Sequence, residues 1–382
     1  MIKTRKKRKQ NKSLFYRISA WLHLWLGIIS GIIVVIVSLT AAILTFEQEL
    51  RVAFQPYQSV KEENRPFLPP SQLSEKVMAK YKFESVAGVF YQGAGRSAIV
   101  PYYADRNNFT VIYINPYTAE ILHHQKLDDD FYRIMLVGHY QLWLPRNIGK
   151  PLVSYATLIF VITLITGMVL WWPKRWTKTT AKASFFIKTK AKFKRLNYDL
   201  HNVLGFYSLL IAMVLALTGM VYGMKWFSDA VYYVGSAGEV QKKDRAVSDT
   251  TIMSNHTLPE QDILYKQLLD QEVDIKNQIL SISYPFGKAG TWGIGINPKP
   301  GTRYLESYNY YEQHSLKRLA APVSYEDGNG GDRIMKLNYD LHVGSIGGIW
   351  TKIIAFLVCM ISASLPVTGF IIWIKKKNKF TF

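Results

Sequence analysis

Four long apolar segments constrain the fold of this chain more than any other feature of its sequence. Within the 382 residues they cover positions 24–46, 152–172, 203–224 and 349–374. Each reaches the roughly 20 residues that an α-helix needs to cross about 30 Å of hydrocarbon. The first follows a basic run, but it is longer than the apolar part of a signal peptide, roughly 7–15 residues, and so indicates an uncleaved anchor. The sequence therefore predicts a membrane protein with four transmembrane α-helices.

The net charge of +20 is concentrated in three segments of the chain. Residues 1–20, 174–200 and 375–382 together carry the whole positive excess. With four crossings, all three segments lie on one side of the membrane, and the positive-inside rule makes that side cytoplasmic. We therefore expect a multi-pass protein with both termini in the cytoplasm. We also expect these segments to attract anionic membrane lipids, and we expect no nucleic-acid partner.

The segments between the apolar runs are too long and too patterned to be simple loops. "SQLSEKVMAKY" (71–81) opens on a capping serine and has helical spacing, and "LPEQDILYKQLLDQ" (258–271) has helical spacing too. Each is followed by runs rich in β-branched and aromatic residues, which are typical of strands. Each outer segment thus predicts a small α+β domain, in which one helix lies on an antiparallel sheet.

The expected organisation is two tandem span–domain–span repeats. The boundaries that we predict are a basic N-terminus at 1–20, a first span at 21–46, an outer domain at 47–148, a second span at 149–173, a basic loop at 174–200, a third span at 201–225, a second outer domain at 226–341, a fourth span at 342–374 and a basic tail at 375–382.

The hexamer "LNYDLH" occurs twice, at 196–201 and at 337–342, each time just before an apolar run. Asn and Asp are favoured N-cap residues, so either of them could begin a helix here. The hexamer then places its last residue, His201 or His342, in the first turn of a span.

Four of the eight histidines fall at equivalent places in the repeat. We expect His23 and His201 near the cytoplasmic face, and His139 and His342 near the outer face. Because both halves have the same orientation, a twofold axis along the membrane normal would pair the histidines at each face. A histidine at a membrane interface can also be a simple amphipathic anchor. Duplication alone, however, does not explain histidines at both ends of the spans.

Facing pairs of neutral imidazoles fit the two axial positions of a b-type haem. The chain has one cysteine, Cys359, and no Cys-x-x-Cys-His motif, so any haem is held without covalent attachment. Gly27 and Gly205, one turn beyond their histidines, leave room for a porphyrin or a neighbouring helix. Nearby cations could meet the haem propionates: Arg17, Lys194 and Arg195 inside, Arg133 and Lys336 outside.

The remaining histidines fall in the outer domains. We expect these four to be ordinary surface or strand residues: His123, His124, His256 and His314. The alternative for His123 and His124 is that they line a substrate site.

Several stretches resemble the PepSY-associated transmembrane proteins of bacteria. They are "LHLWLGIISGIIVVIVSLTAAILTFEQEL" in the first span, "PYTAEIL" (116–122) and "TGMVLWWPKR". The likeness covers essentially the full chain, although Asn115 and Ala119 replace the Asp and Gly usual in the family. The resemblance implies PepSY-like outer domains in a bacterial inner-membrane protein, often associated with iron uptake. Some members look like haem-containing reductases of ferric siderophores, such as the ferrioxamine reductase.

The leading hypothesis is therefore a transmembrane oxidoreductase with two bis-histidine haems b. His23 and His201 would ligate the inner haem, and His139 and His342 the outer one, with irons roughly 20 Å apart across the bilayer core. The expected acceptor is a ferric siderophore or another ferric chelate in the periplasm, and the expected donor is a cytoplasmic reductase or a quinol.

A second hypothesis is a haem-free PepSY scaffold that binds a peptide or an envelope protein. A solute transporter is disfavoured, because the spans offer no buried acids from which to build a coupled site.

Overall fold

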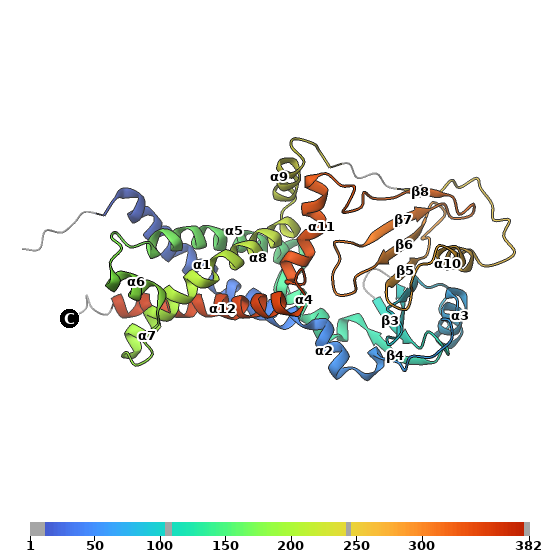
Figure 1. Ribbon diagram of the computed structural model, residues 1–382, viewed down its shortest axis with the longest axis horizontal. Coiled ribbons are helices and arrows are strands. Elements are labelled where there is room, and N and C mark those ends of the chain that lie inside the picture. The colour runs from blue at the N-terminus through green and yellow to red at the C-terminus, as the bar shows by residue number, and fades with distance from the viewer. Residues whose placement is uncertain (1–11, 104–108, 242–245, 378–382) are drawn as a thin grey trace, which may run out of the picture. The chain divides into compact units, whose positions relative to one another are not determined.

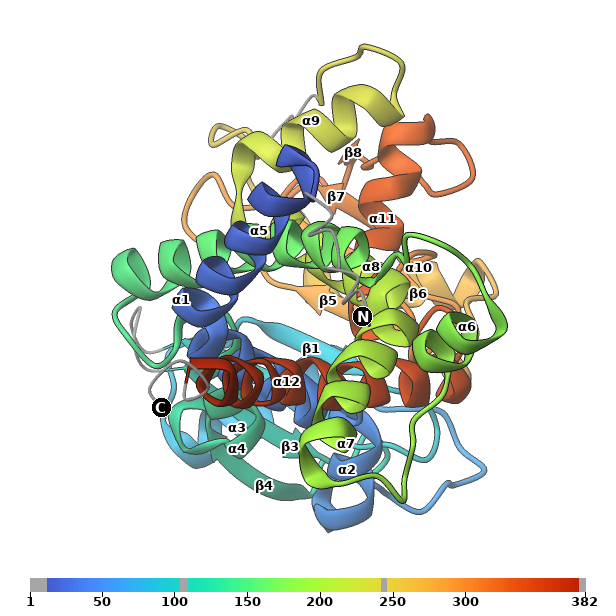
Figure 2. The same ribbon diagram turned by 90° about the vertical axis from the view of Figure 1, so that its left-hand side faces the viewer.

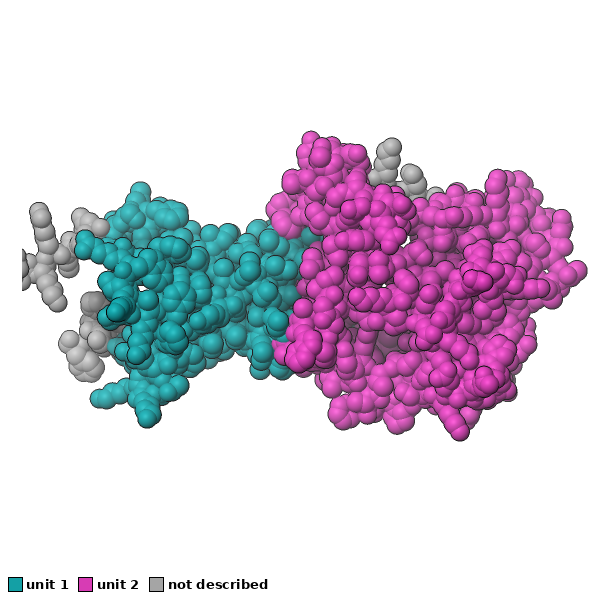
Figure 3. All heavy atoms as spheres, viewed as in Figure 1, with its two compact units in different colours: residues 1–42, 137–224, 354–382 teal, residues 43–136, 225–353 magenta. Residues whose placement is uncertain are grey.

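The computed structural model describes residues 12–103, 109–241 and 246–377, which fall into two compact units (Figure 3). The first unit comprises residues 1–42, 137–224 and 354–382, and the second comprises residues 43–136 and 225–353. Most of the predicted basic N-terminus (residues 1–11) and of the basic tail (residues 378–382) lies outside the described residues.

The described residues contain four helices that are long and apolar enough to cross a membrane. Their most apolar windows have mean hydropathies of 2.1 to 2.7. Such segments become helices in lipid because only a helix or a closed barrel satisfies every backbone N–H and C=O there. The four spans are α1 (Leu14–Thr45), α5 (Arg146–Trp171), the continuous segment Phe193–Gly223, and α12 (Ile349–Lys377).

The third span changes its helical form on the way through the bundle. It begins as α7 (Phe193–Asp199), passes through a π-helical turn, η3 (Leu200–Leu204), and continues as α8 (Gly205–Gly223). π-Helical turns are rare and often occur at functional sites. The span thus begins before residue 201, and His201 lies inside it.

The four spans follow one another around a ring in the order α1, α5, α8, α12, as Figure 2 shows from the end where α1 begins. Close approaches connect neighbours: Gly223 of α8 lies against Ser154 of α5, and Gly31 of α1 lies against Pro366 of α12. Leu164, Ala212 and Val358 form a buried apolar cluster. α1 and α8 therefore lie across the bundle from each other.

The strands of both predicted outer domains join in one eight-stranded sheet in the second unit (Figure 1). Its order is β4-β3-β2-β1-β5-β6-β7-β8, and every neighbouring pair is antiparallel. The two halves meet where β1 pairs with β5, for example Phe90 with Ser281. The strands are β1 (Gly88–Tyr91), β2 (Ala98–Tyr103), β3 (Phe109–Ile114), β4 (Ile121–Lys126), β5 (Ile279–Ser283), β6 (Trp292–Asn297), β7 (Ser307–Tyr311) and β8 (Arg318–Ala320).

One apolar core serves the whole sheet. Two helices, α3 (Pro70–Tyr81) and α10 (Glu260–Asp270), contribute Leu73 and Leu264 to it. Ser71 was predicted to cap the first of these helices, but it lies inside α3. Its backbone N–H and hydroxyl donate to the carboxylate of Asp262 on α10, at 2.9 and 2.5 Å. The two outer segments are therefore one structural unit, and not two separate domains.

Shorter helices connect these parts of the chain. In the second unit, Arg51 of α2 (Glu47–Phe54) makes a bidentate ion pair with the buried Asp130, at 2.6 and 2.7 Å. Lys352 in the first turn of α12 pairs with Glu49 of α2 at 2.7 Å. The remaining elements are α2 (Glu47–Phe54), η1 (Pro56–Gln58), η2 (Leu127–Asp129), α4 (Phe131–Gln141), α6 (Lys178–Phe185), α9 (Lys225–Gly235) and α11 (Gly330–Val343).

Replacing Asp262 by Ala should destabilise the second unit. The substitution leaves two donors of the buried Ser71 without their acceptor, which costs about 1–3 kcal/mol. Thermal unfolding of the full-length protein, followed by circular dichroism, measures the loss. Asp270→Ala on the exposed face of the same helix is the matched control, and equal stabilities of the two variants would contradict the assignment.

Candidate functional site

His23 and His201, the predicted inner pair, lie close together in the first unit. Their ring centroids are 6.1 Å apart and their planes stand at 80° to each other. His23 comes from α1, and His201 comes from the π-helical turn that leads into α8. The two imidazoles thus approach each other from helices on opposite sides of the ring of spans (Figure 2).

His23 is held through its Nδ1 atom by α5. Nδ1 lies 3.0 Å from the Thr163 carbonyl oxygen and 3.3 Å from Thr166 Oγ1. A carbonyl oxygen only accepts hydrogen bonds, so Nδ1 carries the proton and donates it. The partners thereby assign the tautomer. In a neutral imidazole of this tautomer, Nε2 presents a lone pair, which is the form that binds a metal.

His201 is held in the same way by α12. Its Nδ1 lies 2.9 Å from Thr368 Oγ1. The Thr368 hydroxyl donates its own proton to the carbonyls of Ser364 and Leu365, both at 3.0 Å. Its oxygen is therefore left to accept the Nδ1 proton, and His201 also presents its lone pair at Nε2.

A glycine makes room for each of these two rings. A Cβ built on Gly167 would lie 3.1 Å from Cε1 of His23, and one on Gly369 would lie 3.1 Å from Cε1 of His201. Both approaches are tighter than ordinary van der Waals contact. On each facing span, a threonine (Thr166 or Thr368) thus lies within hydrogen-bond distance of Nδ1, and the glycine after it leaves room for the ring.

The spacing of the two rings suits a shared metal ion. With metal–nitrogen bonds of about 2 Å and a ring radius on each side, imidazoles on opposite sides of one ion have centroids roughly 6 Å apart. The observed 6.1 Å agrees with this value. A Cβ on Gly27 would meet nothing within 4 Å, whereas one on Gly205 would lie 3.6 Å from Leu365 Cδ2. The separation of the two rings and their shared tautomer therefore suit bis-imidazole ligation of one metal ion, and Gly27 places no side chain on the α1 side.

His139 has the same kinds of Nδ1 partners as His23, a carbonyl and a threonine hydroxyl, and they belong to α1. It lies in the last turn of α4, where its Nδ1 is 3.0 Å from the Val37 carbonyl and 3.4 Å from Thr40 Oγ1 of α1. The carbonyl again makes Nδ1 the donor. Burial lowers the pKa of His139, so its imidazole is neutral at pH 7. Three histidines thus share one partner pattern and one tautomer.

Comparison with known proteins agrees with this architecture. The family described as "PepSY-associated TM region" matches residues 20–376. The chain belongs to this family. No curated protein matches it. The family name and the four apolar helices together identify a multi-pass PepSY-associated membrane protein.

The two "LNYDLH" copies of this PepSY-associated protein lie inside helices, so the prediction that they begin spans is wrong. The first copy follows the N-cap residue Lys192 by several positions. The second lies in α11, whose capping box is made by Asn329 and Asp332. In both copies the aspartate, Asp199 or Asp340, is completely buried.

These buried aspartates bind backbone N–H groups of neighbouring loops. Asp199 accepts from Lys188 N at 3.2 Å. Asp340 accepts from Arg303 N and Tyr304 N at 2.9 and 2.8 Å. The hexamer therefore ties a loop to a histidine-bearing helix, which explains why it contains an acid two residues before the histidine.

His342 belongs to the second unit and lies in the last turn of α11. α11 ends at Gly344, which adopts the left-handed conformation with φ 77°, and α12 begins at Ile349. His342 thus precedes the fourth span instead of lying within it. His139 has the corresponding place, at the end of α4 and before α5.

The predicted inner cations differ in their surroundings. Arg17 is exposed on α1. Arg195 Nη2 lies 2.9 Å from Asp199 Oδ1, an ion-pair distance without hydrogen-bond geometry. The charge of Arg195 is therefore already balanced by a buried carboxylate.

The predicted outer cations both lie in the second unit. Arg133 is half-buried on α4. Lys336 of α11 donates from Nζ to the Glu306 carbonyl at 3.2 Å, and burial lowers its pKa. Lys336 thus anchors α11 to the loop before β7.

The histidines outside the repeat have local partners. His123 stacks on Tyr57, with ring centroids 4.0 Å apart, and His256 Nε2 lies 2.9 Å from the His314 carbonyl. His124 packs edge-on against Tyr81. Across the part of the chain that the structure describes, no group of three or more His, Cys, Asp or Glu residues is placed to hold a metal ion.

An aromatic cluster stands beside the His201 helix. The buried Trp171 stacks on Phe206 at 3.8 Å and meets Trp176 at 5.8 Å and Phe185 at 5.3 Å. Trp171 Nε1 also donates to the Ser184 carbonyl at 3.3 Å. The cluster therefore fixes the basic loop and α6 against α5 and α8.

Alanine at Gly369 and at Gly27 should have different effects on stability. At Gly369 the new methyl group would press on the His201 ring and break its bond to Thr368. At Gly27 it meets no atom, and Ala favours a helix over Gly by about 1 kcal/mol. Thermal unfolding in detergent should rank Gly369→Ala below the parent and Gly27→Ala level with it or above it. The reverse order would contradict the tight fit at Gly369.

Proposed function

We propose that this protein carries electrons across a membrane through two b-type haems, and that His23 and His201 are the axial ligands of one of them. The observation that supports this most directly is the fixed tautomer of both rings at a spacing suited to one iron. Two imidazole lone pairs in an apolar span are unfavourable unless something binds them. Iron porphyrin satisfies both at once.

When bound, haem supplies one-electron chemistry, because its iron changes between the ferric and ferrous states. The chain supplies ligation and orientation. Thr163, Thr166 and Thr368 hold the Nδ1 protons, which fixes the rings and raises the basicity of Nε2. Arg17 offers a cation to a propionate.

The same proposal assigns His139 and His342 to the second haem. The sequence repeat, and not a distance, is the basis for pairing them. His139 has the Nδ1 partners expected of a haem ligand, and His342 occupies the corresponding place before α12. We further propose that the chain is a tandem repeat of two span–domain–span halves, which makes the two sites equivalent.

The orientation that we propose follows from charge. The basic segments at the start of α1, between α5 and α8, and at the end of α12 belong to the same end of the spans, which the positive-inside rule makes cytoplasmic. The second unit would then lie in the periplasm of a bacterium, and the spans in its inner membrane.

The acceptor that we propose is a ferric siderophore or another ferric chelate outside the membrane. One electron converts Fe(III) to Fe(II), a softer ion that hard oxygen ligands hold less tightly. A cytoplasmic reductase or a quinol would supply the electron. The protein would thus be an oxidoreductase of the ferric siderophore reductase type in iron acquisition.

Replacing His23 or His201 by Ala should remove one haem equivalent, because one axial ligand is lost in each variant. The measurement is the Soret and α-band absorbance per protein, oxidised and dithionite-reduced, after expression with ample haem. His256→Ala, at an exposed histidine outside the spans, is the control and should keep the parent spectrum. A colourless parent protein would favour the haem-free scaffold.

Thr368→Val should keep the haem but raise its midpoint potential. Valine is nearly isosteric but cannot accept the Nδ1 proton of His201, so the ligand becomes a weaker donor to ferric iron. One hydrogen bond of about 1 kcal/mol corresponds to roughly 40 mV for one electron. Thr157→Val on α5, whose hydroxyl bonds only within its own helix, is the control for a redox titration. Equal potentials in the two variants would count against this role of Thr368.

A further inference from the structure

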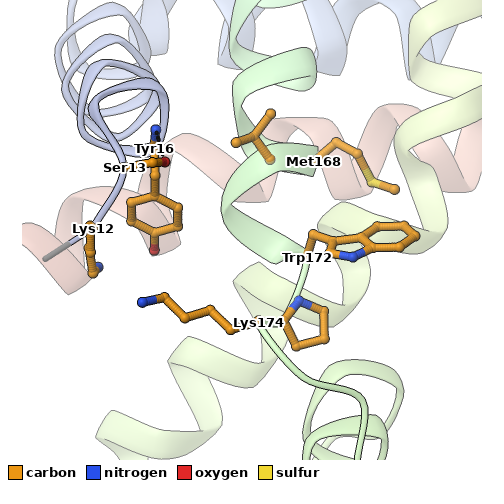
Figure 4. Close-up of a pocket in the computed structure, with 8 residues that line it drawn as sticks. Lys12, Ser13, Tyr16, Met168, Trp172 and Lys174 are labelled. Carbon is orange, nitrogen blue, oxygen red and sulfur yellow. Dashed lines mark hydrogen bonds between the residues drawn. The ribbon is translucent and has the colours of Figure 1, made fainter. Parts of the chain in front are cut away.

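A cleft separate from the histidine site opens at one end of the span bundle, where α1 begins and α5 ends (Figure 4). Its volume is about 520 Å³. Lys12 and Tyr16 line it from the start of α1. Met168, Trp172 and Lys174 line it from the end of α5. The proposed electron path does not use this cleft.

The lining carries positive charge and no acid. Lys12 Nζ lies 4.2 Å above the ring of Tyr16. Figure 4 shows the Lys174 side chain extending from the end of α5 toward the α1 side of the cleft, where Lys12 and Tyr16 lie. Two ammonium groups on one opening attract a phosphate, to which lysine binds as a point charge.

The rest of the lining is apolar and belongs to the membrane. Met168 and Val169 lie in the last turn of the apolar span α5. Trp172 is 57% exposed just beyond that turn, and Trp and Tyr are enriched where a span leaves the hydrocarbon. The cleft is therefore cationic toward the end of the bundle and apolar toward its middle.

We infer that this cleft binds an anionic phospholipid, with its phosphate between Lys12 and Lys174 and one acyl chain against Met168 and Val169. A soluble phosphate would use only the lysines and would leave the apolar wall in contact with water. Basic pockets between transmembrane helices are known places for anionic headgroups. The inference does not depend on haem.

Such a lipid would bridge α1 and α5. These are the two spans that the hydrogen bonds of His23 to Thr163 and Thr166 already connect. Lipid occupancy should therefore stabilise the same helix pair from the membrane surface.

Native mass spectrometry of the full-length protein tests the site. The delipidated protein is titrated with phosphatidylglycerol or with phosphatidylcholine. The parent should retain one phosphatidylglycerol preferentially, and Lys12→Ala/Lys174→Ala should weaken that binding on the order of tenfold or more. Lys188→Ala/Lys190→Ala removes the same charge from exposed positions of the segment between α5 and α8, which also contains Lys174, and should leave the binding unchanged. Equal losses in both double variants, or no loss in the first, would overturn the site.

Two further experiments distinguish binding of a phospholipid from binding of a soluble phosphate. Phosphatidylglycerol with brominated acyl chains should quench the parent's tryptophan fluorescence, and Trp172→Phe should lose part of that quenching. Lys12→Arg/Lys174→Arg should restore lipid retention. If millimolar inorganic phosphate displaced the lipid completely, the cleft would be a phosphate site, and the assignment to a lipid would be wrong.

Discussion

The candidate site depends on the hydrogen bonds that imidazole Nδ1 atoms donate to neighbouring spans. Each bond fixes one tautomer, orients one ring and connects one helix to the next. Hydrocarbon contains no acceptor that competes for such a proton, so the hydrogen bond to the neighbouring span is retained. The same bond recurs for His23 and His139, whose acceptors are both carbonyls three residues before a threonine of the facing span. The lone pairs that would hold a metal are therefore a product of helix packing.

The second unit is held together by a different interaction. Pairing of β1 with β5 makes one sheet from two halves of the chain, so each half covers an edge that the other would expose. Both halves also contribute to one apolar core. The second unit is thus built from two chain segments, residues 43–136 and 225–353, that are distant in the sequence.

The sequence predicted the features that depend on long periodic patterns. The four spans and the helix-then-strands order of each outer segment follow from hydropathy and β-branched runs, and the structure has both. The sequence does not predict that the two sets of strands form one sheet, because each outer segment has the helix-then-strands pattern of a separate α+β domain. Thr166 and Thr368 were visible as repeated Thr-Gly pairs, but their role needs the ring order of the spans, which no local spacing contains. The hexamer predicted a helix cap because aspartate is a favoured N-cap residue, but Asp199 and Asp340 instead accept hydrogen bonds from backbone N–H groups of neighbouring loops.

The π-helical turn at Leu200–Leu204 determines how many residues the chain needs between α7 and α8. Such a turn holds one residue more than a regular helix, and each residue rotates the helix face by about 100°. The segment before it directs Asn197 to the Thr368 carbonyl of α12, and the segment after it packs on α5. The additional residue lets α7 direct Asn197 toward α12 while α8 keeps its packing on α5. A single deletion here would rotate one set of contacts away from its partners, so the fold depends on the number of residues in this turn as well as on their identity.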